Sequence, residues 1–142
     1  MCLFCSIVLD TSKAHIVLED GGSLAFLDHR PLFPGHTLLI PKEHVETLAD
    51  LPTARIQEFF EHAQMLAIAV ETSMGAEGTF VAMNNRVSQS VPHLHVHIVP
   101  RRRKDGLRGF FWPRSKYRDH DHMVETAAEV RAAVEHISAE QR

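Results

Sequence analysis

The chain has 142 residues and a net charge of −3 when its 11 histidines are taken as neutral. This length suits a single domain, and a composition with 44% hydrophobic and 23% charged residues is typical of a globular protein. No apolar run approaches the roughly 18 residues of a membrane span, and no overall positive charge favours nucleic acid, so we expect neither a membrane nor a nucleic acid as partner.

The N-terminus carries the only two cysteines, Cys2 and Cys5, in a Cys-x-x-Cys pair. It lacks the basic start and long apolar stretch of a secretory signal, so we expect a cytoplasmic protein. In a reducing compartment such a pair favours metal or redox chemistry over a structural disulfide. A thioredoxin-type redox pair follows a strand, and a single residue precedes Cys2, which makes zinc the favoured interpretation. The alternative is that both cysteines are small buried residues near a terminus.

The first part of the chain predicts three strands. Residues 15–20 and 23–27 are short apolar runs that flank Gly21-Gly22, a pair typical of a hairpin turn. Residues 36–41 are predicted to form the third strand. An antiparallel pair of strands should therefore open the domain.

Two helices are predicted from apolar residues at helical spacing. The first covers 56–70, with Thr53 as the expected N-cap and Gly75 beyond its end. A second apolar stripe over 123–137 predicts a helix near the C-terminus. The first of these helices should turn its stripe toward the core.

Two further strands are expected, over 78–83 and 93–99. The predicted order of elements is therefore β-β-β-α-β-β-α. This order favours an α+β fold, in which an antiparallel sheet carries its helices on one face.

Three histidines, His93, His95 and His97, alternate with apolar residues in the last predicted strand. Side chains two apart in a strand share a face and lie about 6.6 Å apart, so we expect a row of imidazoles backed by an apolar face. Histidine is uncommon, and three at strict alternation favour chemistry over a strand that merely faces solvent. One possible chemistry is metal chelation, because His-x-His places two nitrogens on one side. The other is a nucleophilic imidazole whose neighbours orient its ring.

The whole motif is His-φ-His-φ-His-φ-φ, where φ is apolar, preceded by Gln89-Ser90-Val91 and followed by Pro100-Arg101. It strongly resembles the histidine triad (HIT) nucleotide-binding superfamily, and the stretches 24–28 and 34–44 resemble it too. The resemblance implies a HIT-like fold, with a five-stranded antiparallel sheet, one long helix and a C-terminal helix, joined across a homodimer.

The resemblance covers about residues 2–101. We therefore expect one domain over 1–142, with its core at about 2–101 and a C-terminal extension at about 102–142 that lies outside the shared pattern.

The resemblance also implies the roles of particular residues. In this superfamily the middle histidine, here His95, attacks the α-phosphate to form a nucleotidyl-histidine that water hydrolyses. Asp28 would bind the ribose hydroxyls, and His36 and His97 would complete the catalytic pocket. Donors to the phosphate or leaving group would come from four residues before the triad: Asn84, Asn85, Gln89 and Ser90.

One loop departs from the pattern. Many relatives carry a glycine-rich loop between the asparagine and the glutamine, whereas this chain has only Arg86-Val87-Ser88. The loop looks about two residues shorter by that comparison. We therefore expect an altered approach to whatever lies beyond the α-phosphate.

Zinc is the expected cofactor, in a structural role. In relatives with the N-terminal cysteine pair, the histidine after Pro-Lys-x and the first triad histidine complete the site. The implied ligands are Cys2, Cys5, His44 and His93. A metal that holds His93 would pin the strand beside His95.

The implied function is a hydrolase or transferase that acts on purine nucleoside monophosphate derivatives such as phosphoramidates. A dinucleoside polyphosphate hydrolase is the alternative within the same chemistry. A non-catalytic nucleotide-binding or scaffold protein is the alternative of another class.

Two segments keep open interpretations. The basic run Arg101-Arg102-Arg103-Lys104 could face phosphates, although such a run is more often a solvated turn. The aromatic residues Phe110, Phe111 and Trp112 could cover part of a dimer interface or of the substrate site, or could pack on their own core.

Overall fold

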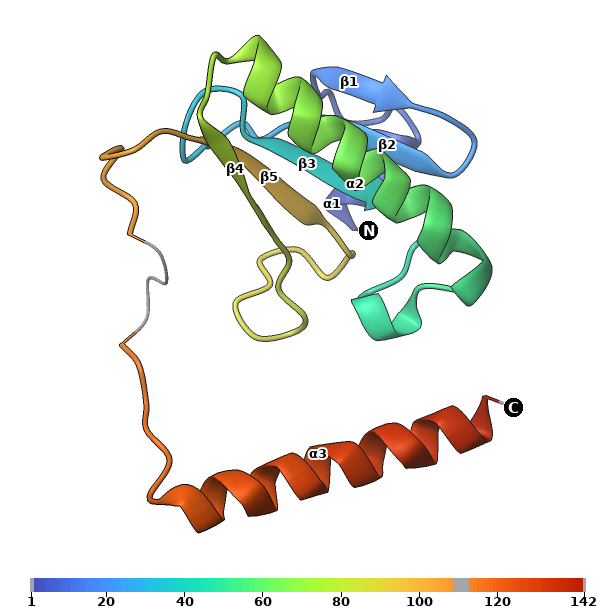
Figure 1. Cartoon of the computed structure of the whole chain (residues 1–142). Coiled ribbons are helices and arrows are strands. Elements are labelled where there is room, and N and C mark those ends of the chain that lie inside the picture. The colour runs from blue at the N-terminus through green and yellow to red at the C-terminus, as the bar shows by residue number, and fades with distance from the viewer. Residues whose placement is uncertain (1, 109–112, 142) are drawn as a thin grey trace. The chain divides into compact units, whose positions relative to one another are not determined.

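A computed structural model describes residues 2–108 and 113–141 (Figure 1). Its elements, in chain order, are α1 (Leu3–Val8), β1 (Ile16–Glu19), β2 (Ser23–Leu27), β3 (Thr37–Pro41), the 3-10 helix η1 (Leu48–Asp50), α2 (Thr53–Ser73), β4 (Gly78–Ala82), β5 (Val96–Arg101) and α3 (His120–Glu140). The chain divides into two compact units, of which the first ends at Asp105 and the second begins at Gly106. The aromatic residues 110–112 lie outside the described residues.

The first unit is built on an antiparallel sheet whose five strands lie in the order β1-β2-β3-β5-β4 (Figure 1). This confirms the predicted five-stranded antiparallel sheet. The turn between β1 and β2 is closed by Asp20, whose Oδ1 accepts hydrogen bonds from the backbone N–H groups of Gly22 and Ser23. Strand β5 pairs with a neighbour on each side, so the segment that leads into it is held at the middle of the sheet.

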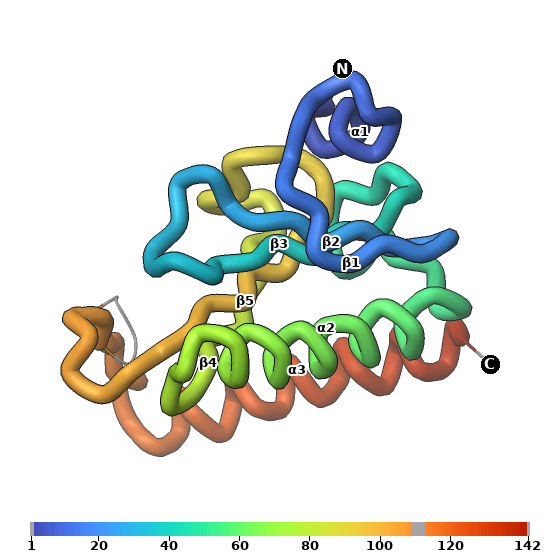
Figure 2. Tube along the Cα trace, turned by 90° about the horizontal axis from the view of Figure 1, so that it is seen from above, coloured from blue at the N-terminus to red at the C-terminus, as the bar shows by residue number. Residues whose placement is uncertain are grey.

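Both faces of the sheet are covered, and Figure 2 shows α1 and α2 on opposite sides of it. One core cluster joins α2 to residues such as Ala25 and Leu39, and a second joins Phe4 of α1 to Leu24 and Phe26. The prediction of helices on one face only is therefore wrong. Strands β2 and β3 are apolar at nearly every position, and a strand with two apolar faces must be covered on both.

Helix α2 extends the predicted helix by about one turn at its start. Thr53 is its first residue, and Pro52 occupies the N-cap position, so Thr53 is not the N-cap. Gly75 follows the end with φ of 58°, in the left-handed region that suits glycine there. Proline is tolerated at a helix start because the first N–H groups have no partner inside the helix.

The predicted strand over 93–99 is shifted toward the C-terminus. Strand β5 begins at Val96, so His93 and His95 lie in the segment before it, and only His97 lies in the strand. That segment is still tied to the fold, because Leu94 N–H donates to the carbonyl of Val45 at 2.7 Å. The three histidines therefore differ in backbone environment.

Helix α3 confirms the predicted C-terminal helix. Asp119 caps it by accepting a hydrogen bond from His122 N–H at 2.8 Å, and none of its residues is buried. Among the described residues, no helix has both the length and the apolar character that crossing a bilayer requires.

Candidate functional site

The ring of His95 is 3% exposed and is held through one nitrogen. Its Nδ1 lies 2.7 Å from the carbonyl oxygen of His93, and a carbonyl only accepts, so Nδ1 carries the proton. A neutral ring then has its lone pair on Nε2. Within the described residues, His95 Nε2 has no hydrogen-bond partner. Among those residues, the only side-chain nitrogen or oxygen that is both buried and without a partner is His62 Nδ1. His95 Nε2 is therefore not buried and is open to solvent. This is the state that a nucleophilic imidazole requires.

A second pair of histidines, His36 and His97, lies beside this ring. The backbone N–H of Leu32 donates to His36 Nδ1 at 3.1 Å, so the proton of a neutral His36 is on Nε2. His36 Nε2 lies 2.9 Å from His97 Nδ1 and donates to it, which leaves the proton of His97 on its own Nε2. The ring centroids of His97 and His95 are 5.0 Å apart. These two hydrogen bonds thus leave His97 Nε2 as an N–H donor next to His95, the candidate nucleophile.

Burial keeps this pair neutral. Burial, with repulsion from the nearby His95 and His36, lowers the pKa of His97 to about 4, against the opposing effect of the Asp28 carboxylate. Burial also lowers the pKa of His36, although the carboxylate of Asp28 opposes that shift. Both rings are therefore uncharged near neutral pH, as the tautomer assignment requires.

Asp28 follows β2 at the edge of the histidine group. Its Oδ2 lies 3.7 Å from His36 Nε2, and its Oδ1 accepts from the backbone N–H of Arg30 at 2.9 Å. Its own N–H donates to the carbonyl of His36 at 2.9 Å. The structure therefore brings Asp28, His36, His95 and His97 together.

The four expected phosphate donors lie in the loop between β4 and β5, and three of them bond within the protein. Gln89 uses both ends of its amide, accepting from Arg86 N–H at 2.8 Å and donating to the Glu46 carbonyl at 2.7 Å. Asn85 accepts from Leu48 N–H at 2.8 Å, and Asn84 donates to the Ser88 carbonyl at 3.2 Å. Ser90 is exposed. The three amides therefore hold the loop, and Ser90 presents its hydroxyl.

The same loop has an unusual backbone. Arg86 and Ser88 have φ of 69° and 61°, in the left-handed region that glycine adopts most easily. The loop that lacks glycine in the sequence thus uses two ordinary residues where glycine would be unstrained.

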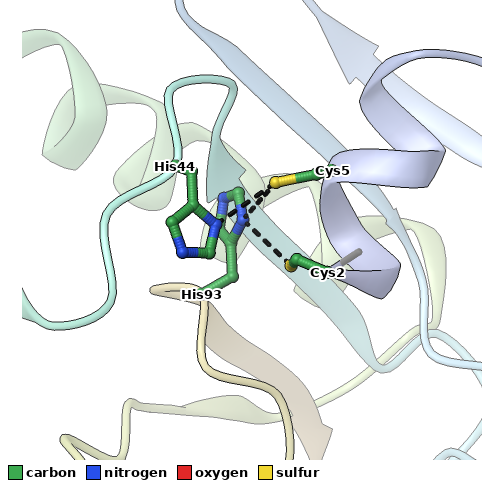
Figure 3. Close-up of side chains that lie close together, drawn as sticks. All are labelled: Cys2, Cys5, His44 and His93. Carbon is green, nitrogen blue, oxygen red and sulfur yellow. Dashed lines mark hydrogen bonds between the residues drawn. The ribbon is translucent and has the colours of Figure 1, made fainter.

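Cys2, Cys5, His44 and His93 form a separate cluster (Figure 3). The Sγ atoms of Cys2 and Cys5 each lie 3.6 Å from His93 Nδ1, and Cys5 Sγ lies 3.2 Å from His44 Nδ1. Ligands of a tetrahedral zinc ion, with bonds of about 2.0–2.3 Å, lie roughly 3.3–3.8 Å apart. The four residues therefore fit a zinc site of the Cys₂His₂ type.

The tautomer of His93 favours a metal at this cluster, and the pKa of Cys5 argues against a redox pair. His93 Nε2 donates to the carbonyl of Pro41 at 2.8 Å, so its lone pair is on Nδ1, the atom that faces the sulfurs. Burial raises the pKa of the Cys5 thiol, and the adjacent Cys2 raises it further. A redox cysteine needs a lowered pKa, so the direction of this shift argues against redox chemistry at the pair.

The basic run is engaged with its own part of the chain. Arg101 Nε lies 2.6 Å from Asp105 Oδ2, and Arg103 pairs with Glu77 at 2.5 Å. Arg102 donates to the carbonyl of Met74. These contacts favour the solvated turn over a phosphate site.

Sequence reasoning did not single out Phe4 or Pro41. The ring of Phe4 contacts both His93 and His95, and the carbonyl of Pro41 sets the tautomer of His93. The available signal for Phe4 was a large apolar residue inside the Cys-x-x-Cys pair. A backbone carbonyl such as that of Pro41 leaves no signal in a sequence.

Comparisons with known proteins point to one family. Residues 10–104 match the HIT domain family. The chain is 38% identical over 108 residues to an uncharacterised HIT-like protein of Mycobacterium tuberculosis, and the aligned region covers 75% of each chain. It is 36% identical over 109 residues to adenosine 5'-monophosphoramidase HNT1 of Saccharomyces cerevisiae, covering 75% of this chain and 66% of that one. A Zn-bound histidine triad family protein from Mycobacterium smegmatis superposes with a TM-score of 0.71 at 34% identity, covering 93% of this chain and 96% of that one.

Proposed function

Because the chain belongs to the HIT domain family, we propose that it is a nucleotide hydrolase or transferase that acts at the α-phosphate of nucleoside monophosphate derivatives. The observation that carries the proposal is the state of His95, whose Nδ1–H donates to the His93 carbonyl and whose Nε2 is open. The similarity to an adenosine 5'-monophosphoramidase supports a purine phosphoramidate as substrate.

In the proposed reaction, His95 Nε2 attacks the α-phosphorus and the bond from phosphorus to the leaving nitrogen breaks. The leaving nitrogen keeps the electron pair of that bond and takes a proton from solvent. Water then attacks the phosphorus of the nucleotidyl-histidine, the P–N bond to His95 breaks, and a proton returns to solvent. The net change is hydrolysis of a phosphoramidate to a nucleoside monophosphate and an amine, with His95 regenerated.

The neighbouring groups suit this reaction. The carbonyl of His93 accepts from Nδ1–H and stabilises the positive charge that the ring acquires when Nε2 bonds to phosphorus. The Nε2–H of His97 donates to a phosphate oxygen, and His36 fixes the tautomer that makes this possible. Asp28 is the acceptor for the ribose hydroxyls.

The loop residues have two parts in the proposal. Ser90 donates to the phosphate or the leaving group. The amides of Asn84, Asn85 and Gln89 shape the loop that carries Ser90. Asn84 and Gln89 donate to backbone carbonyls, which they would exchange for the phosphate when a nucleotide binds. Asn85 accepts from Leu48 N–H through its Oδ1, so its Nδ2 is the atom that would donate to the phosphate.

Zinc is proposed as a structural ion at Cys2, Cys5, His44 and His93. When bound, it supplies a crosslink between α1, the loop after β3 and the segment before β5. The Zn-bound relative supports this assignment.

The proposal includes a homodimer. Strands β1 and β4 are the outer strands of the sheet, so each leaves one edge unpaired in the described part of the chain. Joining two sheets would cover such an edge. A monomer mass by light scattering at micromolar concentration would contradict this part.

The proposed function is tested with adenosine 5'-phosphoramidate and the His95→Gln variant. We expect the variant to lose activity by at least about 1,000-fold, because it lacks the ring on which the proposed covalent intermediate forms. The exposed His15 provides a matched control, and His15→Gln should turn over at the wild-type rate. Mass spectrometry of rapidly quenched wild type should find one nucleotidyl group on His95.

Two outcomes would overturn the assignment. Equal turnover by His95→Gln and wild type would exclude His95 as nucleophile, and tight nucleotide binding without turnover would favour the non-catalytic alternative. Diadenosine triphosphate, assayed in parallel, separates the two enzyme classes. Faster turnover of that compound would favour the dinucleoside polyphosphate hydrolase.

A further inference from the structure

In the sequence of helix α1 and its N-cap, the aromatic residue Phe4 lies between Cys2 and Cys5, the two cysteines of the proposed metal site. Cys2 occupies its N-cap, Cys5 lies one turn further on, and Phe4 is buried with 5% exposure. The helix has six residues, and a helix this short is unstable in isolation. Its place on the sheet therefore depends on what its side chains bind.

The Phe4 ring reaches the first two triad histidines. Its centroid lies 5.1 Å from that of His95 at an interplanar angle of 83°, and 5.9 Å from that of His93 at 71°. Phe26 of β2 completes the group, at 5.4 Å and 68°. These are edge-to-face contacts, which have a preferred geometry as well as a preferred distance.

The hydrogen bond to His93 does not orient the His95 ring completely. One bond at Nδ1 fixes one point of the ring, whereas the torsion that turns an imidazole about its Cβ–Cγ bond has a broad minimum. The direction of Nε2 therefore needs a second constraint. Phe4 belongs to α1, which covers one side of the sheet (Figure 2), and its ring contacts that of His95.

We propose that Phe4 is a positioning residue for His95, and that the metal at Cys2, Cys5, His44 and His93 keeps Phe4 in place. The catalytic consequence rests on the proposed function, but the ring contact does not. The cysteines flank Phe4 in the sequence and hold α1 against His44 and His93 (Figure 3). Loss of the metal would release α1 and move Phe4 away from His95.

The first experiment follows the ring protons of His95 by NMR in the zinc-loaded full chain, assigned by their loss in His95→Gln. Removing zinc from the wild type with a chelator should shift these resonances, because the ring current of Phe4 no longer acts on them. The kcat for adenosine 5'-phosphoramidate should fall by about 10- to 100-fold, since small errors in the position of a reacting group are costly. KM should stay within about twofold, because Phe4 does not touch the substrate.

The second experiment uses Phe4→Leu with zinc bound. We expect the His95 resonances to shift in the same direction as after chelation, and kcat to fall with a full zinc content by atomic absorption. Ile7→Ala is the matched control, because Ile7 packs in the same apolar cluster on the same helix and makes no ring contact with His95. Its His95 resonances and kcat should equal those of the wild type.

Two results would overturn the inference. One is a wild-type chain that has lost its zinc and keeps its His95 resonances. The other is a zinc-loaded Phe4→Leu that matches Ile7→Ala in resonances and kcat. The chelation experiment needs no substitution, so the inference stays testable if Phe4→Leu does not fold.

Failure of this inference is distinguishable from failure of the proposed function. A wild type that does not turn over the phosphoramidate refutes the proposed function, while the NMR shifts still decide the ring contact. A wild type that turns over, with an inactive His95→Gln and a fully active Phe4→Leu, refutes only the positioning role.

Discussion

The carbonyl oxygen of His93 accepts the Nδ1–H of His95 at 2.7 Å, while the ring of the same His93 faces the sulfurs of Cys2 and Cys5. One residue thus belongs to two clusters, with its backbone in the candidate catalytic site and its side chain in the candidate metal site. The sulfurs of Cys2 and Cys5 are therefore separated from the His95 ring by a single residue. This relationship motivates the first prediction.

Cys5→Ser should make the stability of the protein independent of chelator. A ligand that binds only the folded chain stabilises it by about 2.7 kcal/mol at 100 times its dissociation constant. In zinc-containing buffer, the wild type should therefore lose stability on addition of a chelator, as measured by urea unfolding. The free energy of unfolding of Cys5→Ser should equal that of the chelated wild type, both before and after chelator is added. An equal response of the two proteins to chelator would exclude Cys5 as a ligand.

The His36–His97 pair predicts that stability falls as the pH decreases below about 6.5. Burial lowers the pKa of His97 to about 4 and lowers the pKa of His36, whereas both titrate near 6.5 in the unfolded chain. Between these values the unfolded state binds more protons than the folded state. The free energy of unfolding should therefore decrease by up to about 1.4 kcal/mol per pH unit for each group. The slope fades above pH 6.5 and disappears by about pH 7.5, where the unfolded histidines have also lost their protons.

This pH dependence is measured by urea unfolding from pH 7.5 to 4.5 in chelator, so that metal release does not contribute. The charged and titratable groups that face His97 are Asp28, His36 and His95. His97→Asn should lose less stability over this interval than the wild type. His15→Asn, at an exposed histidine, should follow the wild type, and equal slopes for His97→Asn and His15→Asn would contradict the prediction.

Ser88→Gly should stabilise the loop before the triad. Ser88 has φ of 61°, and the left-handed conformation costs an ordinary residue about 1–2 kcal/mol. Glycine avoids this cost but adds about 0.4–1 kcal/mol of unfolded-state entropy, so the expected net gain is about 0.5–1 kcal/mol in urea unfolding. Ser90→Gly, in the same loop and outside the left-handed region, should lose stability. A loss of the same size for Ser88→Gly would show that its backbone is unstrained.

Asp28→Asn should lower the kcat/KM for substrates that carry ribose hydroxyls. A hydrogen bond to a charged group contributes about 1.5–3 kcal/mol, so kcat/KM for adenosine 5'-phosphoramidate should fall by about 10- to 100-fold. The 2',3'-dideoxy analogue provides the control, because it has neither ribose hydroxyl and cannot make the bond. Wild type and Asp28→Asn should use that analogue nearly equally well. An equal loss on both substrates would place Asp28 elsewhere in the reaction.

Much of the fold could be predicted because it depends on local periodicity. The apolar spacing over 56–70 indicates α2, and the short apolar runs before it indicate β1 to β3, since each pattern reports which face of an element is buried. The start of β5 is the exception. His93 and His95 continue the alternation of a strand, but their segment bonds to the Val45 carbonyl and lies before the ladder, and alternation alone cannot detect where a partner strand ends.

The sequence by itself determined the residue types of both sites, through the spacing of three histidines and the Cys-x-x-Cys pair. The tertiary structure alone decided which nitrogen of each ring is protonated, because the Leu32 N–H and the carbonyls of Pro41 and His93 select the tautomers. It also decided that α1 covers the second face of the sheet and brings Phe4 to His95. The physical reason is that periodicity reflects local backbone geometry, whereas hydrogen-bond acceptors and ring contacts come from segments far away in the chain.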